Sequence, residues 1–185
     1  MCNATTAAQY FHLLRRQVRR DVRKPLVLFT PKAPLRMKES RSRIDDLVQG
    51  SFQEVLDDPF LADPSTVQRV VFCSGKVAWD AFAERDKRQA PVAIVRVEQL
   101  YPFPLEQMRA VLARYSNAKQ VVWLQEEPDN MGPWHFVEAR FWRIKDDGYD
   151  LRSVCRIGSG SPATGSKAVH DQELADLMDE TFEAF

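Results

Sequence analysis

The stretch that decides the fold reads VQRVVFCSGKVAWDAFAERDKRQAPVAIVRVEQL, from Val67 to Leu100. Its first part is a short, continuous apolar run that ends at Gly75, which indicates a buried strand. The next part has the periodicity of an amphipathic helix, with the inward residues Val77, Ala78, Ala81 and Phe82. VAIVRVEQL is a second apolar run, so the stretch predicts a strand, a helix and another strand.

The same alternation continues to the end of the chain. QVVWLQEE (120–127) and LRSVCRIG (151–158) are predicted strands, and PLEQMRAVLARY (104–115), GPWHFVEARFWRIK (132–145) and HDQELADLMDETFEAF (170–185) are predicted helices. Strands that alternate with helices form a mostly parallel sheet with helices on both faces. We therefore expect an α/β fold with three α/β/α layers. We find no internal repeat.

The first 43 residues differ from the rest of the chain in charge. They contain 11 Lys or Arg against Asp21 and Glu39, a balance of +9, so the remainder carries −9 in a chain of zero formal charge. Within them, AAQYFHLLRRQVRR (7–20) has apolar residues at helical spacing among four arginines, which predicts a basic amphipathic helix. Such a segment suggests an arm that docks on its own domain, on a partner subunit or on an anionic ligand. A solvated helix face is the plain alternative.

Between this helix and the alternating region the patterns are weaker. LVLFT (26–30) is a short apolar run between two prolines and is predicted as a buried strand. PKAPLRMKESRSR (31–43) is polar and interrupted by proline, so we expect a surface loop or a segment that lies across another chain. A short helix is expected at residues 52–56.

GSGSPATGSK (158–167) has the glycine spacing of a phosphate-binding P-loop but a different residue order. A P-loop needs a lysine directly after the second glycine and a hydroxyl residue after that. Here Ser166 precedes Lys167, which moves the ammonium roughly 100° around the following helical turn. We therefore expect a structural loop in which Ser166 or Thr164 caps the last helix and Lys167 meets solvent or a carboxylate.

The sequence contains no catalytic or metal-binding motif of its own. Its thiols and imidazoles are scattered, at Cys2, Cys73, Cys155, His12, His135 and His170. Glu126 and Glu127 are adjacent, so on a regular strand they point to opposite faces and could not share a substrate. No apolar run is long enough for a membrane span, which takes about 18 residues or more. We assign no catalytic and no metal-binding residue, and we expect a binding role in a reducing, intracellular compartment.

Seven phrases follow one another in a specific order: TTAAQYFHLLRRQ, RKPLVLFTPK, GSFQEVLDD, RVVFCSGKVAWD, VAIVRVEQLYPFP, WLQEEPDNMGPW and SPATGSKAVH. Together they resemble the carboxy-terminal segment of the thiamine-dependent first component of the 2-oxoglutarate dehydrogenase complex. The resemblance implies a transketolase-type C-terminal domain over residues 44–185. It also implies that residues 1–43 are a basic helix, strand and arm continuing from an upstream domain that this sequence does not contain.

In that family the upstream domains bind thiamine diphosphate and magnesium. The resemblance therefore implies a segment that holds no cofactor and is inactive alone, within an enzyme of the tricarboxylic acid cycle that decarboxylates 2-oxoglutarate. The implied partners are the upstream domains, a second copy in a homodimer and the lipoyl-bearing succinyltransferase component, with no nucleic acid and no membrane. The implied location is the cytoplasm of a bacterium or the mitochondrial matrix. Without these partners, apolar residues of the first helix and of the helix around 134–142 should lie on the outside.

Some actinobacterial members of the family are activated by acetyl-CoA, and the resemblance places Arg16 and Gln99 at positions that contact this activator. A guanidinium suits phosphate and adenine, being planar and a multiple donor. However, Glu106 and Gln107 replace basic residues of those members, and Ser51 replaces a lysine. Pairing of Arg16 with a carboxylate is therefore the competing interpretation. The alternative to an enzyme segment is a free-standing regulatory module that binds a nucleotide or an acidic partner through its basic helix.

Overall fold

The computed structural model describes residues 1–183 and contains a five-stranded sheet in the order β1-β3-β2-β4-β5. The four longer strands run parallel, and β1 pairs antiparallel with β3 at one edge. Every residue of β2 and β3 is buried, as expected of parallel strands that are covered on both faces. The strands are β1 (Val55–Leu56), β2 (Arg69–Cys73), β3 (Val92–Val97), β4 (Gln120–Pro128) and β5 (Asp150–Arg156).

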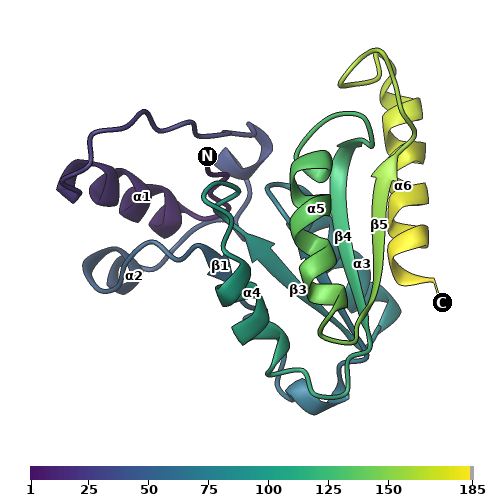
Figure 1. Cartoon of the computed structure of the whole chain (residues 1–185). Coiled ribbons are helices and arrows are strands. Elements are labelled where there is room, and N and C mark those ends of the chain that lie inside the picture. The colour runs from purple at the N-terminus through teal and green to yellow at the C-terminus, as the bar shows by residue number, and fades with distance from the viewer. Residues whose placement is uncertain (184–185) are drawn as a thin grey trace.

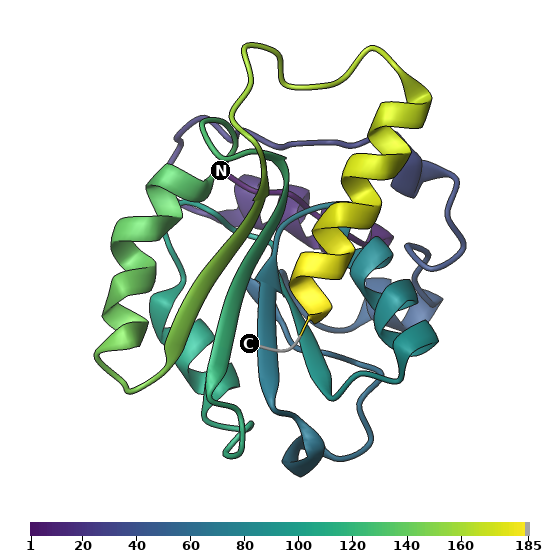
Figure 2. The same cartoon turned by 90° about the vertical axis from the view of Figure 1, so that its right-hand side faces the viewer.

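Helices cover both faces of this sheet (Figure 1, Figure 2). Alternate residues of β2 show the two cores: Val70 and Phe72 pack with α4 and α5, whereas Val71 and Cys73 pack with α3 and α6. The predicted three-layer α/β/α architecture is confirmed. The helices are α1 (Ala7–Arg19), α2 (Ile44–Val48), α3 (Val77–Arg88), α4 (Leu105–Leu112), α5 (Trp134–Lys145) and α6 (Lys167–Phe182), with 3₁₀ turns at Ala33–Leu35 and Pro64–Thr66.

The loop before α6 has the structural role expected of it. Ser166 is the N-cap of α6, and its Oγ accepts a hydrogen bond from Val169 N at 3.5 Å. Lys167 pairs with the carboxylate of Asp171 one turn further along the helix. The predicted cap and the predicted carboxylate partner are both confirmed.

The interpretation of LVLFT as a buried strand was wrong. Leu28 forms only an isolated bridge with Cys2. Leu26 and Leu28 pack against a small cluster beneath α1, while Val27 and Phe29 remain 47% and 43% exposed. The segment is extended but covered on one side, because no second layer lies over it.

The prediction of a short helix at residues 52–56 was also wrong. The short helix of this region is α2, and Val55 and Leu56 instead form β1. Gln53 N donates to Gln9 Oε1 at 3.0 Å, and Gln9 Nε2 donates to Gln53 O at 2.6 Å. These bonds use backbone groups that a helix would pair within itself, so the segment stays extended beside α1.

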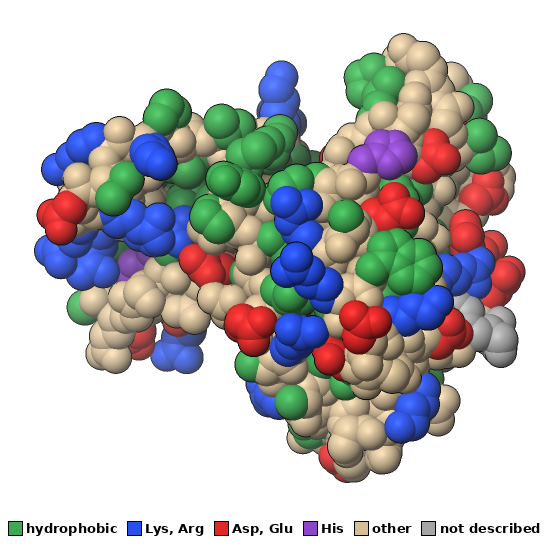
Figure 3. Space-filling model, viewed as in Figure 1, with side chains coloured by type: hydrophobic (Ala, Val, Ile, Leu, Met, Phe, Trp, Pro, Cys, Tyr) green, Lys and Arg blue, Asp and Glu red, His purple; other side chains and the backbone are tan. Residues whose placement is uncertain are grey.

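The apolar face of α1 points away from the domain. The helix begins after Thr6 as predicted, but the residues it buries are Gln9, His12 and Leu13. The apolar side chains on which the prediction of an amphipathic helix rested are exposed to solvent: Tyr10 is 42% exposed, Phe11 44%, Leu14 44% and Val18 70%. Figure 3 shows hydrophobic side chains gathered over this arm. On α5, Trp142 is 51% exposed, so apolar surface of both helices lies outside as expected.

Candidate functional site

Arg16 and Gln99, which lie 83 positions apart in the chain, are in direct contact. Arg16 Nη2 donates to Gln99 Oε1 at 2.7 Å, and Arg16 Nη1 donates to Glu54 Oε1 at 3.3 Å. The guanidinium carbon also lies 4.1 Å from the centroid of the Phe52 ring. Pairing of Arg16 with a carboxylate is therefore confirmed. A role of Arg16 and Gln99 in nucleotide binding stays a prediction.

A buried carboxylate sets the position of α1 and therefore of Arg16. Glu98 is fully buried at the end of β3 and accepts hydrogen bonds from Thr5 N at 2.9 Å, from the Thr5 hydroxyl, and from Gln9 Nε2 at 3.4 Å. Arg96 Nη1 donates to the same Thr5 hydroxyl at 3.0 Å. Burial raises the pKa of Glu98, against the opposing effects of the Arg96 charge and the hydrogen bonds from Thr5. One buried acceptor group thus joins the start of α1 to the central sheet.

Gln99, the next residue, is held by its backbone and its side chain. Its N–H donates to Glu54 O at 3.1 Å, and its Nε2 donates to Pro102 O at 2.9 Å. Its amide oxygen is thereby left facing Arg16. The orientation of Gln99 is fixed by one neighbour close in sequence, Pro102, and by two that are distant, Glu54 and Arg16.

A pocket of ≈ 590 Å³ opens beside Arg16, and we call it the arginine pocket. Burial, followed by the positive charge of Arg20, lowers the pKa of Arg16. A guanidinium stays protonated at neutral pH, so the lowered pKa marks a cation held at a cost that an added anion would reduce. The residues that matter for its charge and shape are Arg15, Arg16, Arg19, Arg20, Phe52 and Glu54.

Two of the three replacements noted in the sequence lie in this pocket. Ser51 and Gln107 line it, and Gln107 Nε2 donates to Glu54 Oε2 at 2.6 Å. Glu106 instead faces solvent, with its side chain 82% exposed and 3.3 Å from Arg109. Ser51 and Gln107 thus contribute neutral groups to the pocket that contains Arg16.

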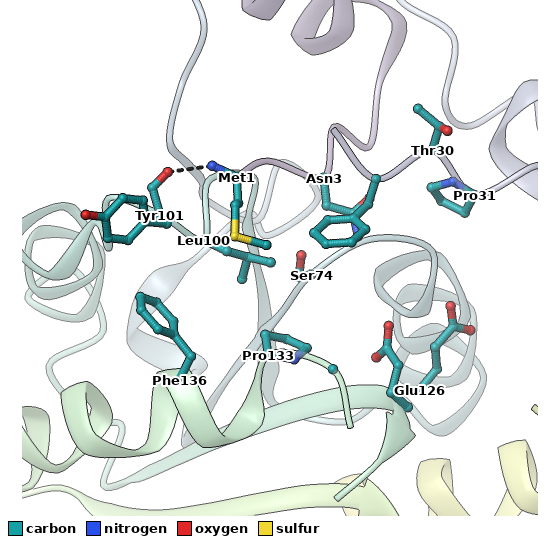
Figure 4. A pocket seen from close by; sticks show the side chains of 13 residues that line it. Met1, Asn3, Thr30, Pro31, Ser74, Leu100, Tyr101, Glu126, Pro133 and Phe136 are labelled. Carbon is teal, nitrogen blue, oxygen red and sulfur yellow. Dashed lines mark hydrogen bonds between the residues drawn. The ribbon is translucent and has the colours of Figure 1, made fainter. Parts of the chain in front are cut away.

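A larger cavity, of ≈ 670 Å³, lies at the carboxyl ends of β2 and β4 (Figure 4). We call it the switch-point cavity. Glu126 and Glu127 both line it. The argument that these neighbours face opposite sides was wrong, because the register between β4 and β5 shifts between Leu124 and Pro128 and the regular alternation is interrupted there. No motif marks this cavity, since its walls come from separate segments of the chain.

Within residues 1–183, no group of three or more His, Cys, Asp or Glu side chains is arranged to hold a metal ion. Over the same residues, no helix combines the length and apolar character needed to cross a membrane.

Comparison with known proteins identifies the family of this chain. A family model described as 2-oxoglutarate dehydrogenase C-terminal matches residues 41–182. The chain is 44% identical over 183 residues to the 2-oxoglutarate dehydrogenase E1 component of Cupriavidus necator, covering 98% of this chain and 19% of that protein. It is 41% identical over 186 residues to the protein of the same name from Coxiella burnetii, covering 99% and 20%. A 2-oxoadipate dehydrogenase complex component E1 from Mus musculus is 41% identical over 182 residues, covering 96% and 19%.

These matches agree with the seven sequence phrases, with the parallel sheet and with the helices on both of its faces. The chain spans about a fifth of the length of the curated relatives it matches, and it corresponds to their C-terminal part. The chain belongs to the 2-oxoglutarate dehydrogenase C-terminal family.

Proposed function

We propose that this chain serves as the C-terminal domain of a 2-oxoglutarate dehydrogenase first component, where it supports the homodimer and the surroundings of the active site. Family membership and the identity to full-length relatives support this assignment. The relatives include a 2-oxoadipate component, so the identity of the oxo acid is itself part of the proposal. The whole enzyme would decarboxylate the oxo acid and pass the acyl group to a lipoyl-bearing succinyltransferase component, in the cytoplasm of a bacterium or in a mitochondrial matrix.

The single structural observation that carries this proposal is the exposed apolar face of α1. Tyr10, Phe11, Leu14 and Val18 are each more than two-fifths exposed on one helix. Apolar patches of this kind on a folded domain mark contacts with other protein surfaces. An upstream domain, a second subunit, or both would cover this face in the whole enzyme.

Thiamine diphosphate and magnesium do not fit the residues that the structure describes. No described cluster of ligands suits magnesium, and Lys167, the lysine of the glycine-rich loop, is already paired with Asp171. We therefore place the cofactor on upstream domains of the whole enzyme. No catalytic step is assigned to the residues of this chain.

A domain exchange tests this function. In this chimaera, the 185 residues replace the matching C-terminal segment of the relative from Cupriavidus necator. We expect the chimaera to decarboxylate 2-oxoglutarate, measured by reduction of an artificial electron acceptor. The relative truncated before that segment should be inactive, because α1 would no longer cover the surface of its remaining domains. A chimaera with both Phe11→Asp and Leu14→Asp should lose activity and dimer formation together.

Two outcomes would count against the domain assignment. One is full activity of the truncated relative. The other is a folded, dimeric chimaera that fails to act on 2-oxoglutarate and on 2-oxoadipate.

We propose as a second function that the arginine pocket binds the phosphate groups of a nucleotide such as AMP or acetyl-CoA. The observation that favours it is the gathering of four arginines around one pocket, with Arg16 oriented by Gln99. Guanidinium groups donate charge-assisted, paired hydrogen bonds to phosphate. Glu54 opposes this function, because it pairs with Arg16 and places a negative charge in the pocket.

This opposition leads to a pair of variants with effects of opposite sign. We expect Arg16→Ala to weaken AMP or acetyl-CoA binding by about tenfold or more, because each charge-assisted hydrogen bond contributes ~1.5–3 kcal/mol. Glu54→Gln should strengthen binding several-fold, since it frees Arg16 and removes the negative charge. Calorimetry at constant ionic strength measures both.

Arg23→Ala is the matched control, because Arg23 carries the same charge but donates to Val18 O and does not line the pocket. Equal losses in Arg16→Ala and Arg23→Ala would show non-specific attraction and would contradict the nucleotide site. Nucleotide binding together with an inactive domain exchange would favour the free-standing regulatory module.

A further inference from the structure

The switch-point cavity lies where the topology of the sheet favours a ligand. β2 leads through α3 to β3 on one side of it, whereas β4, on the other side of β2, leads through α5 to β5. The carboxyl ends of β2 and β4 are neighbours in register, with Cys73 opposite Leu124. In open α/β sheets, ligands bind in the crevice at such a reversal of strand order.

One end of the cavity is apolar. Leu100, Tyr101 and Phe136 line it, and the rings of Tyr101 and Phe136 lie 6.0 Å apart in an edge-to-face arrangement. Figure 4 shows these side chains together, with the side chain of Met1 above them. This end suits the aliphatic or aromatic part of a ligand.

The opposite end offers hydrogen-bond acceptors. Glu126 and Glu127 line this end, and Figure 4 shows Glu126 well away from Tyr101 and Phe136. Asn3 and Ser74 also line the cavity, and Figure 4 shows Ser74 between Leu100 and Glu126. Asn3 Oδ1 and Ser74 Oγ are each buried without a hydrogen-bond partner among the described residues. Buried polar atoms are usually paired, so these two atoms indicate missing hydrogen-bond partners, which for the amide oxygen of Asn3 must be a donor.

The two glutamates differ in how their charge is balanced. Lys76 Nζ lies 3.5 Å from Glu126 Oε2 and 2.5 Å from Asp80 Oδ2, so it compensates Glu126. Among residues 1–183, Glu127 has no Lys or Arg within ion-pair distance. The Met1 ammonium donates to Tyr101 O at 2.7 Å, at the apolar end. Glu127 is thus a part-buried carboxylate whose charge has no paired cation.

The pKa of Glu127 is consistent with this geometry. Burial raises it and the neighbouring charge of Glu126 raises it further, whereas a hydrogen bond from the backbone N–H of Glu127 itself and the charge of Arg156 oppose the shift. A carboxylate removed from water without a cation is destabilised, and a cation that arrives beside it recovers part of that energy.

The position of Glu127 is set before any ligand arrives. Gln125 Nε2 donates to Pro128 O at 3.1 Å and to Met131 O at 2.9 Å, which holds the turn from β4 to α5. Gly132 has φ +67°, and a Cβ there would lie 2.9 Å from Glu127 Cβ. The turn therefore packs directly on Glu127, and pre-organisation of this kind reduces the ordering cost of binding.

We propose that the switch-point cavity binds an organic ammonium ion, with its apolar or aromatic body between Leu100, Tyr101 and Phe136 and its ammonium group at Glu127 and Ser74. An ammonium carries three donors and no acceptor, which matches a cavity whose wall offers a carboxylate and unpaired oxygens. The volume of ≈ 670 Å³ is that of a small-molecule site. This site is separate from the arginine pocket, which has the opposite charge, and it does not depend on the functions proposed above.

The test uses 3-phenylpropylammonium as the probe and its neutral analogue 3-phenylpropanol, each titrated into the ¹⁵N-labelled 185-residue chain. We expect the amide signals of Ser74, Leu100 and Gly132 to shift with the ammonium, and the alcohol to bind at least tenfold more weakly. Glu127→Gln should weaken ammonium binding at least tenfold. This variant keeps the shape of the side chain and removes a carboxylate that lacks a cation, so it should fold.

Two further variants keep the result interpretable. Ser74→Ala should weaken ammonium binding several-fold, and Glu106→Gln, an exposed carboxylate outside the cavity, should leave it unchanged. The proposal is overturned if the alcohol binds as well as the ammonium, if Glu127→Gln has no more effect than Glu106→Gln, or if no cavity amide shifts at millimolar probe. Cavity signals that respond only to protein concentration would also overturn it, because a second copy of the chain would then be the occupant.

Discussion

Asp58→Ala is expected to destabilise the domain by about 3–5 kcal/mol, the largest effect of any single substitution considered for this chain. The side chain of Asp58 is fully buried and forms an ion pair with Arg85, whose own side chain is only 6% exposed. Asp58 also accepts hydrogen bonds from Ile94 N at 2.8 Å and from Phe60 N at 2.9 Å. Alanine would leave a buried guanidinium and two backbone donors without this acceptor.

The position of Asp58 explains why the loss should affect the whole domain. β1 covers only the end of β3, at Val97 and Arg96, and Asp58 pairs the N–H of Ile94 further along the same edge. β3 is central to both cores, so the part of its edge that β1 leaves unpaired would be a weak point of the sheet without Asp58. A loss of this size is a large share of the ~5–15 kcal/mol by which domains are stable.

Urea unfolding followed by tryptophan fluorescence measures the change. Asp58→Asn should be less harmful than alanine, because an amide oxygen can still accept from Ile94 N. Asp63→Ala, in an exposed turn of the same region, should cost much less. A free energy of unfolding for Asp58→Ala within 1 kcal/mol of the wild type would contradict the role given to this ion pair.

Glu98→Ala is expected to cost about 3 kcal/mol and to release α1 from the domain, because buried donors left unpaired cost ~1–3 kcal/mol each. The donors that lose their acceptor are Thr5 N, the Thr5 hydroxyl and Gln9 Nε2. Release of α1 would also separate Arg16 from Gln99. Hydrogen exchange over residues 5–19 and tryptic cleavage after the α1 arginines should both increase.

Glu98→Gln separates the hydrogen bonds of Glu98 from its charge. Glutamine retains an acceptor for Thr5, so α1 should stay docked. Hydrogen exchange over α1 as fast as in Glu98→Ala would show that the shape of the side chain at position 98 does not by itself hold α1 in place. Burial raises the pKa of Glu98 above its ordinary value of 4.5, so the folded state binds this proton more tightly than the unfolded state does. The stabilising contribution of this group is therefore complete below pH 4.5 and is lost as the pH rises through the raised pKa. Glu98→Gln should lack this part of the pH dependence in urea unfolding.

The central strands and helices could be predicted because their signals are local. The apolar runs of β2 and β3 and the inward residues of α3 lie where their periodicity placed them. The cap of α6 could also be predicted, since it needs only a hydroxyl residue in front of a helical pattern. Residues close in the chain decide these features.

The candidate sites could be predicted from the sequence only in part. Arg16 and Gln99 were identified only through a family resemblance, and the contact between them comes from the docking of α1 on Glu98. Glu127 was set aside because a regular strand was assumed, whereas the irregular end of β4 turns it into the cavity. Its walls come from loops that the sheet brings together.

The sequence by itself determined the order of strands and helices from β2 onward, the layered α/β class, the family, and the basic charge of the arm, because each is a property of neighbouring residues or of their composition. Only the tertiary structure decided which side of α1 is covered, that Val55 and Leu56 form an edge strand, and that Glu126 and Glu127 share one cavity. The physical reason is that periodicity shows where apolar side chains point relative to their own element. Whether another surface covers them depends on contacts such as that between Thr5 and Glu98, which join segments 93 residues apart.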